Sequence, residues 1–95
     1  MNREHILRLY VAGKTARSER AISSLKQLCE QDLAGQYLVE VIDVLADPAA
    51  AERQKILATP TVIKELPPPV RRVIGDLSQT EQVLVGLDLV KVDPE

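Results

Sequence analysis

The chain has 95 residues, a formal net charge of −2 and hydrophobic residues at 45% of its positions, which predicts one globular domain with a modest core. This composition excludes a disordered chain. Without a basic block or an apolar run of about 18 residues, it predicts no nucleic-acid partner and no membrane span.

Cysteine and histidine are too scarce for several kinds of site. Cys29 and His5 are the single members of their types, so an intramolecular disulfide is impossible and a zinc site within one chain is not expected. No glycine-rich phosphate loop is present, and we expect no cofactor and no metal. The start of the chain does not resemble a signal peptide, which favours a reducing, cytoplasmic setting.

The first half of the chain begins with a predicted strand. Residues 5–12 (HILRLYVA) are apolar on both faces apart from Arg8. That pattern is typical of a central strand that is covered on both sides. Gly13 then ends the strand.

A helix and a second strand are predicted next. Thr15 or Ser18 can cap the helix, and from about Ala16 apolar residues recur at intervals of three and four. Gly35 is a natural left-handed stop. Residues 37–44 (YLVEVIDV) are rich in β-branched side chains and predict a strand parallel to the first, because a helix connects the two.

A short helix opens the second half. Asp47 can accept from free backbone N–H groups and Pro48 fits the first helical position, which predicts a helix over residues 49–57. Thr59-Pro60-Thr61 follows this helix directly. It leads into a third predicted strand at Val62-Ile63.

Prolines then interrupt the chain. Pro67, Pro68 and Pro69 cannot continue a ladder, because proline donates no N–H. Residues 70–77 therefore predict a separate edge strand after a turn.

The segment 78–92 carries conflicting signals. Ser78 and Glu81 can form a capping box, which predicts a helix. Gly86 costs about 1 kcal/mol inside a helix relative to alanine, and the alternating, β-branched residues around it favour a strand. The pattern favours the helix and leaves the strand open. Such conflicts are expected at functional sites or in sequences with two competing packings.

With a final helix, the order β-α-β-α-β-β-α resembles the thioredoxin fold. Thioredoxin chemistry needs a low-pKa thiolate at the start of the first helix, and residues 13–18 (GKTARS) contain no cysteine. Cys29 falls on the apolar stripe of that helix, and we interpret it as a small core residue. The chain therefore resembles a thioredoxin relative without redox activity, and no catalytic residue is predicted.

Several blocks of sequence closely resemble the KaiB family of cyanobacterial circadian clock proteins. They are LYVAG at 9–13, VIDVL at 41–45, KILATPT at 55–61, LPPPVRR at 66–72, IGDLS at 74–78 and GLDL at 86–89. Their combination is specific far beyond a shared fold. The resemblance runs from about Leu7 to Leu89 without an obvious gap.

The resemblance implies a non-enzymatic regulator of a circadian oscillator. Such a protein binds the N-terminal ATPase ring of KaiC, captures KaiA, displaces an output kinase whose sensor domain is KaiB-like, and so modulates KaiC phosphorylation. The resemblance also implies one domain, residues 1–95, with two arrangements. Residues 1–46 would form a constant βαβ half. Residues 47–95 would switch between βαβαββα, the thioredoxin-like bound form, and βαββααβ, a free dimer or tetramer.

Matching positions imply which residues carry these properties. Those that would contact KaiC are Lys55, Arg72, Arg20 and Arg71. Their alternative role is solvated surface, where an exposed ion pair is worth under about 1 kcal/mol. Those that would govern the switch are Pro60, Pro67, Pro68, Pro69, Gly86 and Asp88. Isomerisation at the prolines takes roughly tens to hundreds of seconds and would slow the switch. We expect Gly86→Ala to favour the helical form by up to about 1 kcal/mol.

Departures from the family pattern leave other functions open. Glu40 stands where a basic residue is common, and Lys14 where a small polar turn residue is common. The chain stops at Glu95, before the longer acidic tail of the clock proteins, and this difference counts against the usual tetramer. It is therefore either a clock protein or a KaiB-like stress-response or signalling adaptor without KaiA. A thiol oxidoreductase that depends on Cys29 is a third hypothesis.

Overall fold

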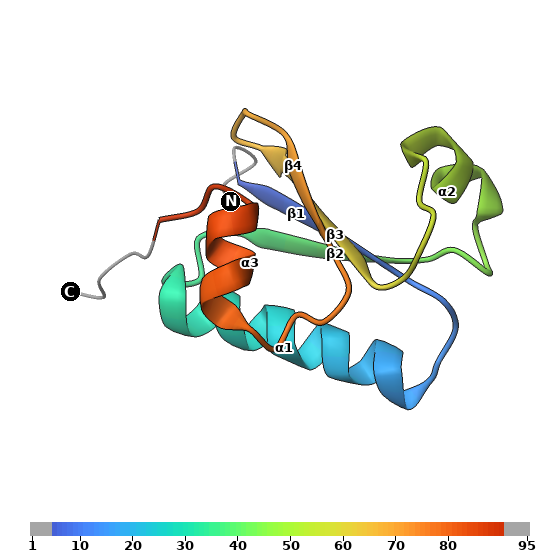
Figure 1. The fold of residues 1–95 in the computed structure, drawn as a ribbon, viewed down its shortest axis with the longest axis horizontal. Coiled ribbons are helices and arrows are strands. Elements are labelled where there is room, and N and C mark those ends of the chain that lie inside the picture. The colour runs from blue at the N-terminus through green and yellow to red at the C-terminus, as the bar shows by residue number, and fades with distance from the viewer. Residues whose placement is uncertain (1–4, 91–95) are drawn as a thin grey trace.

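A computed structural model describes residues 5–90 of the chain (Figure 1). Its elements are β1 Ile6–Val11, α1 Ala16–Asp32, β2 Leu38–Asp43, α2 Pro48–Gln54, β3 Thr61–Leu66, β4 Arg71–Ile74 and α3 Thr80–Gly86. The strands lie in the order β2-β1-β3-β4, with β1 parallel to β2 and the other two pairs antiparallel. This order confirms the thioredoxin-like arrangement predicted from the sequence.

The first half forms as predicted. Thr15 is the N-cap of α1, and its hydroxyl accepts from the Ser18 N–H at 3.1 Å. At the other end, Gly35 is left-handed with φ of 67°, and its N–H donates to the carbonyl of Cys29 at 2.9 Å. Ala34 is left-handed as well, a feature that the sequence did not reveal because alanine disfavours that conformation.

Two helices cover one face of the sheet. Leucines of β1, the apolar stripe of α1, two buried side chains of α3 (Val83 and Leu84) and Leu87 directly after it share one continuous core. In Figure 1, α1 runs beneath the sheet and α3 lies on that same side. This face therefore joins the first half of the chain to its C-terminal helix.

Within residues 5–90, a helix covers the opposite face only at one end. Ala50 of α2 packs against Tyr10 of β1 and Ile63 of β3 in a smaller cluster. Figure 1 shows α2 apart from the other two helices, beyond one end of the strands. The rest of this face carries polar and charged side chains, including Arg8 and Glu40, that are partly exposed.

The second half follows the predicted order with shorter elements. Asp47 caps α2 by accepting from the Ala50 N–H at 3.1 Å. The helix ends at Gln54, earlier than expected, because Lys55 turns left-handed with φ of 55°. Strands β3 and β4 form where predicted, and β4 is an edge strand. The peptide bonds before Pro60, Pro67 and Pro69 are cis.

The conflicted segment is helical in this arrangement. Helix α3 begins at Thr80, with Gln79 as N-cap and no side-chain cap hydrogen bond. The predicted capping box is therefore wrong: Ser78 lies before the N-cap, and its N–H donates to the Asp76 carboxylate at 2.9 Å. The strand alternative does not form over residues 80–90. Val92 lies outside the described residues.

Candidate partner-binding surface

The C-terminal end of α2 presents Lys55 to solvent. Its N–H and that of Ile56 close the helix on the carbonyls of Glu52 and Ala51, at 3.2 and 2.9 Å. This closure needs a left-handed residue, a place usually taken by glycine. Leu57, two residues later, is 93% exposed. An exposed cation and an exposed leucine therefore protrude together at this end of the molecule.

The arginine pair of β4 points to both faces of the sheet. Arg72 pairs with Ile63 and Arg71 with Lys64 of β3, so the two neighbours project to opposite sides. Burial raises the pKa of the Tyr10 hydroxyl, and the charges of Arg53 and Arg72 oppose that shift. Arg72 therefore shares the α2 face with Tyr10, whereas Arg71 does not.

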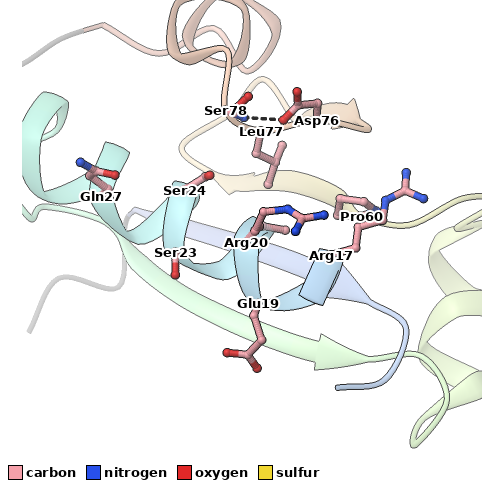
Figure 2. A pocket seen from close by; sticks show the side chains of 11 residues that line it. Arg17, Glu19, Arg20, Ser23, Ser24, Gln27, Pro60, Asp76, Leu77 and Ser78 are labelled. Atoms are coloured by element: carbon pink, nitrogen blue, oxygen red, sulfur yellow. Dashed lines mark hydrogen bonds between the residues drawn. The ribbon is translucent and has the colours of Figure 1, made fainter. Parts of the chain in front are cut away.

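Arg20 lines a groove between α1 and the segment that follows β4. The groove has a volume of about 550 Å³, and Figure 2 shows Arg17 and Arg20 near Pro60 on one wall with Asp76 and Ser78 on the other. The Ser78 backbone N–H, then its hydroxyl, hold the pKa of Asp76 below its ordinary value, and Arg20 adds to this effect. The groove thus presents guanidinium donors next to a fixed carboxylate.

The structure does not gather the four sequence-predicted contacts into one cluster. Lys55 ends α2, Arg72 lies on the face that α2 covers, Arg71 projects to the other face, and Arg20 lies in the groove. All four are exposed.

The described residues do not supply a reactive thiol. Cys29 is 4% exposed, and burial, with the nearby charge of Glu30, raises the pKa of its thiol to about 11. The start of α1, where a thioredoxin thiolate would lie, holds Thr15. The prediction that Cys29 is a core residue is confirmed. In residues 5–90, no set of three His, Cys, Asp or Glu side chains is placed to bind a metal ion.

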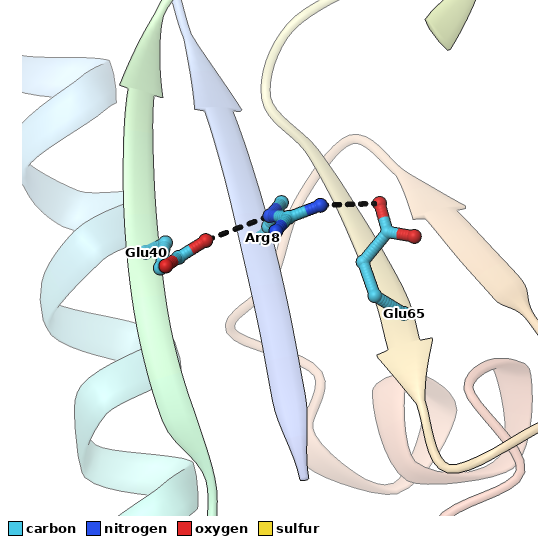
Figure 3. A network of polar contacts seen from close by, with 3 residues as sticks. All are labelled: Arg8, Glu40 and Glu65. Atoms are coloured by element: carbon cyan, nitrogen blue, oxygen red, sulfur yellow. Dashed lines mark hydrogen bonds and ion pairs between the residues drawn. The ribbon is translucent and has the colours of Figure 1, made fainter. Parts of the chain in front are cut away.

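An ion-pair network that sequence analysis missed crosses the open sheet face. Arg8 Nε lies 2.7 Å from Glu40 Oε1, and Arg8 Nη1 lies 3.6 Å from Glu65 Oε2 (Figure 3). The hydrogen bond to Glu40 is the main cause that raises the pKa of Arg8. Aligning the two parallel strands would have found the pair, because Arg8 and Glu40 are direct partners. Glu40 therefore has a partner within this chain.

Gly86 and Asp88, the two C-terminal residues predicted to govern a switch, have definite structural roles in this arrangement. Asp88 is left-handed with φ of 57°, and its N–H and that of Leu89 close α3 on the carbonyls of Val85 and Leu84. A Cβ atom on Gly86 would lie 2.5 Å from Cγ2 of Val73 on β4. Gly86 thus permits the close approach of α3 to β4, which qualifies the simple expectation that Gly86→Ala favours the helix.

A family model described as the KaiB domain matches residues 8–94. The chain belongs to the KaiB family. Among curated relatives, Circadian clock protein KaiB3 of Synechocystis is 56% identical over 90% of this chain and 83% of its own length. Circadian clock oscillator protein KaiB of Prochlorococcus marinus is 59% identical over 90% of this chain and 80% of its own length.

Solved structures place this KaiB-family chain among thioredoxin-like folds. The N-terminal domain of SasA from Synechococcus elongatus superposes with a TM-score of 0.69 at 20% identity, covering 86% of this chain and 77% of that domain. Mitochondrial thioredoxin 3 of Saccharomyces cerevisiae superposes with a TM-score of 0.70 at 15% identity, and the match covers 90% of this chain and 77% of that protein. None of the helices within residues 5–90 is long and apolar enough to cross a membrane.

Proposed function

We propose that this KaiB-family chain is a non-enzymatic regulatory protein of a circadian oscillator, and that it acts in the cytoplasm by binding a KaiC-type ATPase ring in the thioredoxin-like arrangement. In this proposal residues 1–46 keep one structure. Residues 47–95 switch from a free homo-oligomeric form to the bound form. KaiA and a KaiB-like sensor kinase are the further partners, the kinase as a competitor.

The observation that carries the proposal is the close match to curated KaiB clock proteins over nine-tenths of the chain. The absence of a low-pKa thiol in residues 5–90 supports a binding role over thiol chemistry, since the one cysteine is buried. The fold shared with the SasA N-terminal domain supports competition, because two domains of one fold can present similar surfaces to one partner.

Lys55 and Arg72 are the charged contacts that the structure supports best. Both side chains are exposed on or near α2, and exposed Leu57 lies beside Lys55. A cation next to an apolar anchor suits an acidic partner surface that carries a hydrophobic pocket. Arg20 would contribute from the groove, and Arg71 from the opposite face of β4.

Titration into hexameric KaiC with ATP tests the proposal. We expect a complex to form slowly and to weaken by about tenfold, or 1.4 kcal/mol, in each of Lys55→Ala and Arg72→Ala. Lys26→Ala is the matched control, since Lys26 is an exposed lysine of α1 outside the proposed contacts. No complex after long incubation, with phosphomimetic KaiC included, would contradict the proposal.

A second candidate function, an adaptor without KaiA, is favoured by Glu40. Its carboxylate is engaged by Arg8 on the open sheet face, where the family pattern commonly has a basic residue. Adding KaiA to the complex with KaiC separates the two candidates. Formation of a ternary complex supports the clock protein, and a stable binary complex that excludes KaiA supports the adaptor.

A further inference from the structure

A lysine is buried on the face of the sheet that packs against α1 and α3. Lys64 of β3 is 2% exposed, on the face covered by α1 and α3. Its direct partner on β1 is Leu7, and Val62 lies two residues earlier on the same face; both are 0% exposed. The alternation of β3 therefore buries an ammonium group beside the main hydrophobic core.

Among residues 5–90, the ammonium has one weak partner. Lys64 Nζ donates to the backbone carbonyl of Asp88 at 3.4 Å, a long distance for an N–H···O hydrogen bond. Within residues 5–90, Lys64 forms no ion pair. Asp88 is the left-handed residue that ends α3, so the lysine meets the carbonyl end of that helix.

Burying this group opposes the docking of α3. An ammonium that leaves water loses strong hydration, and a single long hydrogen bond returns only part of that loss. The negative end of the helix dipole returns a further part, which is small for a helix of seven residues. An apolar side chain of the same length would fill the space without the loss.

We propose that Lys64 is a built-in destabiliser of α3, which keeps the helix marginally docked so that residues 78–90 can leave the sheet. When α3 undocks, the ammonium regains water, and this recovery lowers the cost of opening. The same lysine therefore sets how often the C-terminal segment is free to rearrange. Its consequence for KaiC rests on the proposed function, in which the docked helix belongs to the binding form.

Amide hydrogen exchange tests this inference without any partner, when it is followed on the NMR signals of the population of free protein in which α3 is formed. Lys64→Met keeps the length of the side chain and removes the charge, and we expect the α3 amides from Val83 to Leu89 to exchange at least about tenfold more slowly. Lys64→Gln, which keeps a polar head, should give a smaller effect. Lys26→Met, on the exposed side of α1, should leave these amides unchanged.

Faster or unchanged exchange of the α3 amides in Lys64→Met would overturn the inference, because the ammonium would then hold the helix or have no influence on it. If Lys64→Met did not fold, faster exchange in Lys64→Gln would overturn it equally. Failure of the protein to bind KaiC would contradict the proposed function and leave the exchange result intact. In KaiC binding itself, Lys64→Met should raise the association rate.

Discussion

The two halves of the chain are built from elements of very different length. In residues 5–46, β1 and β2 pair over six residues, and the 17-residue α1 buries five side chains. In residues 47–90, α2 and α3 have seven residues each, and β4 pairs with β3 over four. Helices this short are unstable alone, so the second half depends on docking, and its local stability should be lower.

This contrast assigns different consequences to similar changes in the two halves. A substitution in the first half should lower the stability of the whole domain. In the thioredoxin-like arrangement, a substitution in α3 should mainly change how often that helix undocks, because a helix of seven residues depends on docking for its stability. Matched positions on the two sides of that boundary should therefore respond differently to the same kind of substitution.

The largest effect is expected from paired core truncations. Leu25 of α1 and Leu87 after α3 are both 0% exposed and belong to the same core. Leu25→Ala should lower the free energy of unfolding by about 2–5 kcal/mol. Leu87→Ala should instead release α3 and leave the exchange protection of β1 and β2 largely intact. Denaturant unfolding measures the global stability of each variant, and amide exchange measures the local opening of α3. An equal loss of global stability in the two variants would contradict the difference between the halves.

A coupled pair tests the contact between α3 and β4. Gly86→Ala alone should stabilise little, since its Cβ would lie 2.5 Å from Val73 Cγ2. In the Val73→Ala background the methyl group has room, and the helix-propensity gain of about 1 kcal/mol should appear. A double-mutant cycle on α3 opening measures this coupling. Independent, additive effects would show that β4 does not constrain Gly86.

Left-handed residues provide a matched pair of smaller effects. Ala34 after α1 and Asp88 after α3 have φ of 54° and 57°. Replacing either with glycine should relieve strain worth roughly 0.5–1 kcal/mol. Ala34→Gly should raise the stability of the whole domain. Asp88→Gly should only reduce how often α3 undocks. Global stabilisation by Asp88→Gly would mean that the two halves unfold as one unit.

The smallest expected effects concern the loss of stability at low pH. Backbone N–H groups, first that of Gly13 and then that of Leu45, lower the pKa of Asp43, as Ser78 does for Asp76. A lowered pKa gives stabilisation that is complete above the unfolded-state value of about 3.9 and is lost as the pH falls through the folded-state value. Asp43→Asn should make the stability of the whole domain depend less on pH, and Asp76→Asn should do so only for the α3 segment. Thermal melting from about pH 5 to pH 2 measures both. Identical profiles for both variants and the parent would contradict this.

The sequence predicted the first half because its signals agree. The apolar strand at 5–12, the hydroxyl cap at Thr15 and the stop at Gly35 all favour the structure that forms. The left-handed Lys55, which ends α2 early, has no local signal, because the residue at such a helix stop is usually glycine. The Ser78 capping box failed because the Asp76 carboxylate takes the Ser78 N–H instead.

The candidate surface was predicted only in part. Exposure of the four cations follows from their charge, but their distribution over α1, α2 and both sides of β4 depends on strand register. The Arg8–Glu40 pair and the burial of Lys64 also depend on register and packing. The sequence alone shows that residues 78–92 carry conflicting helix and strand signals. The structure shows which residues contact or close the helix there: Val73, Lys64 and Asp88.

The most direct test of the central claim is the secondary structure of residues 78–90, measured by amide NMR in the free protein and in its mixture with the KaiC-type ATPase. The account predicts that β1, α1 and β2 keep their signals in both samples, while 78–90 is helical in the complex and differs when the protein is free. One unchanged arrangement of 78–90 in both samples, with the complex formed, would contradict it.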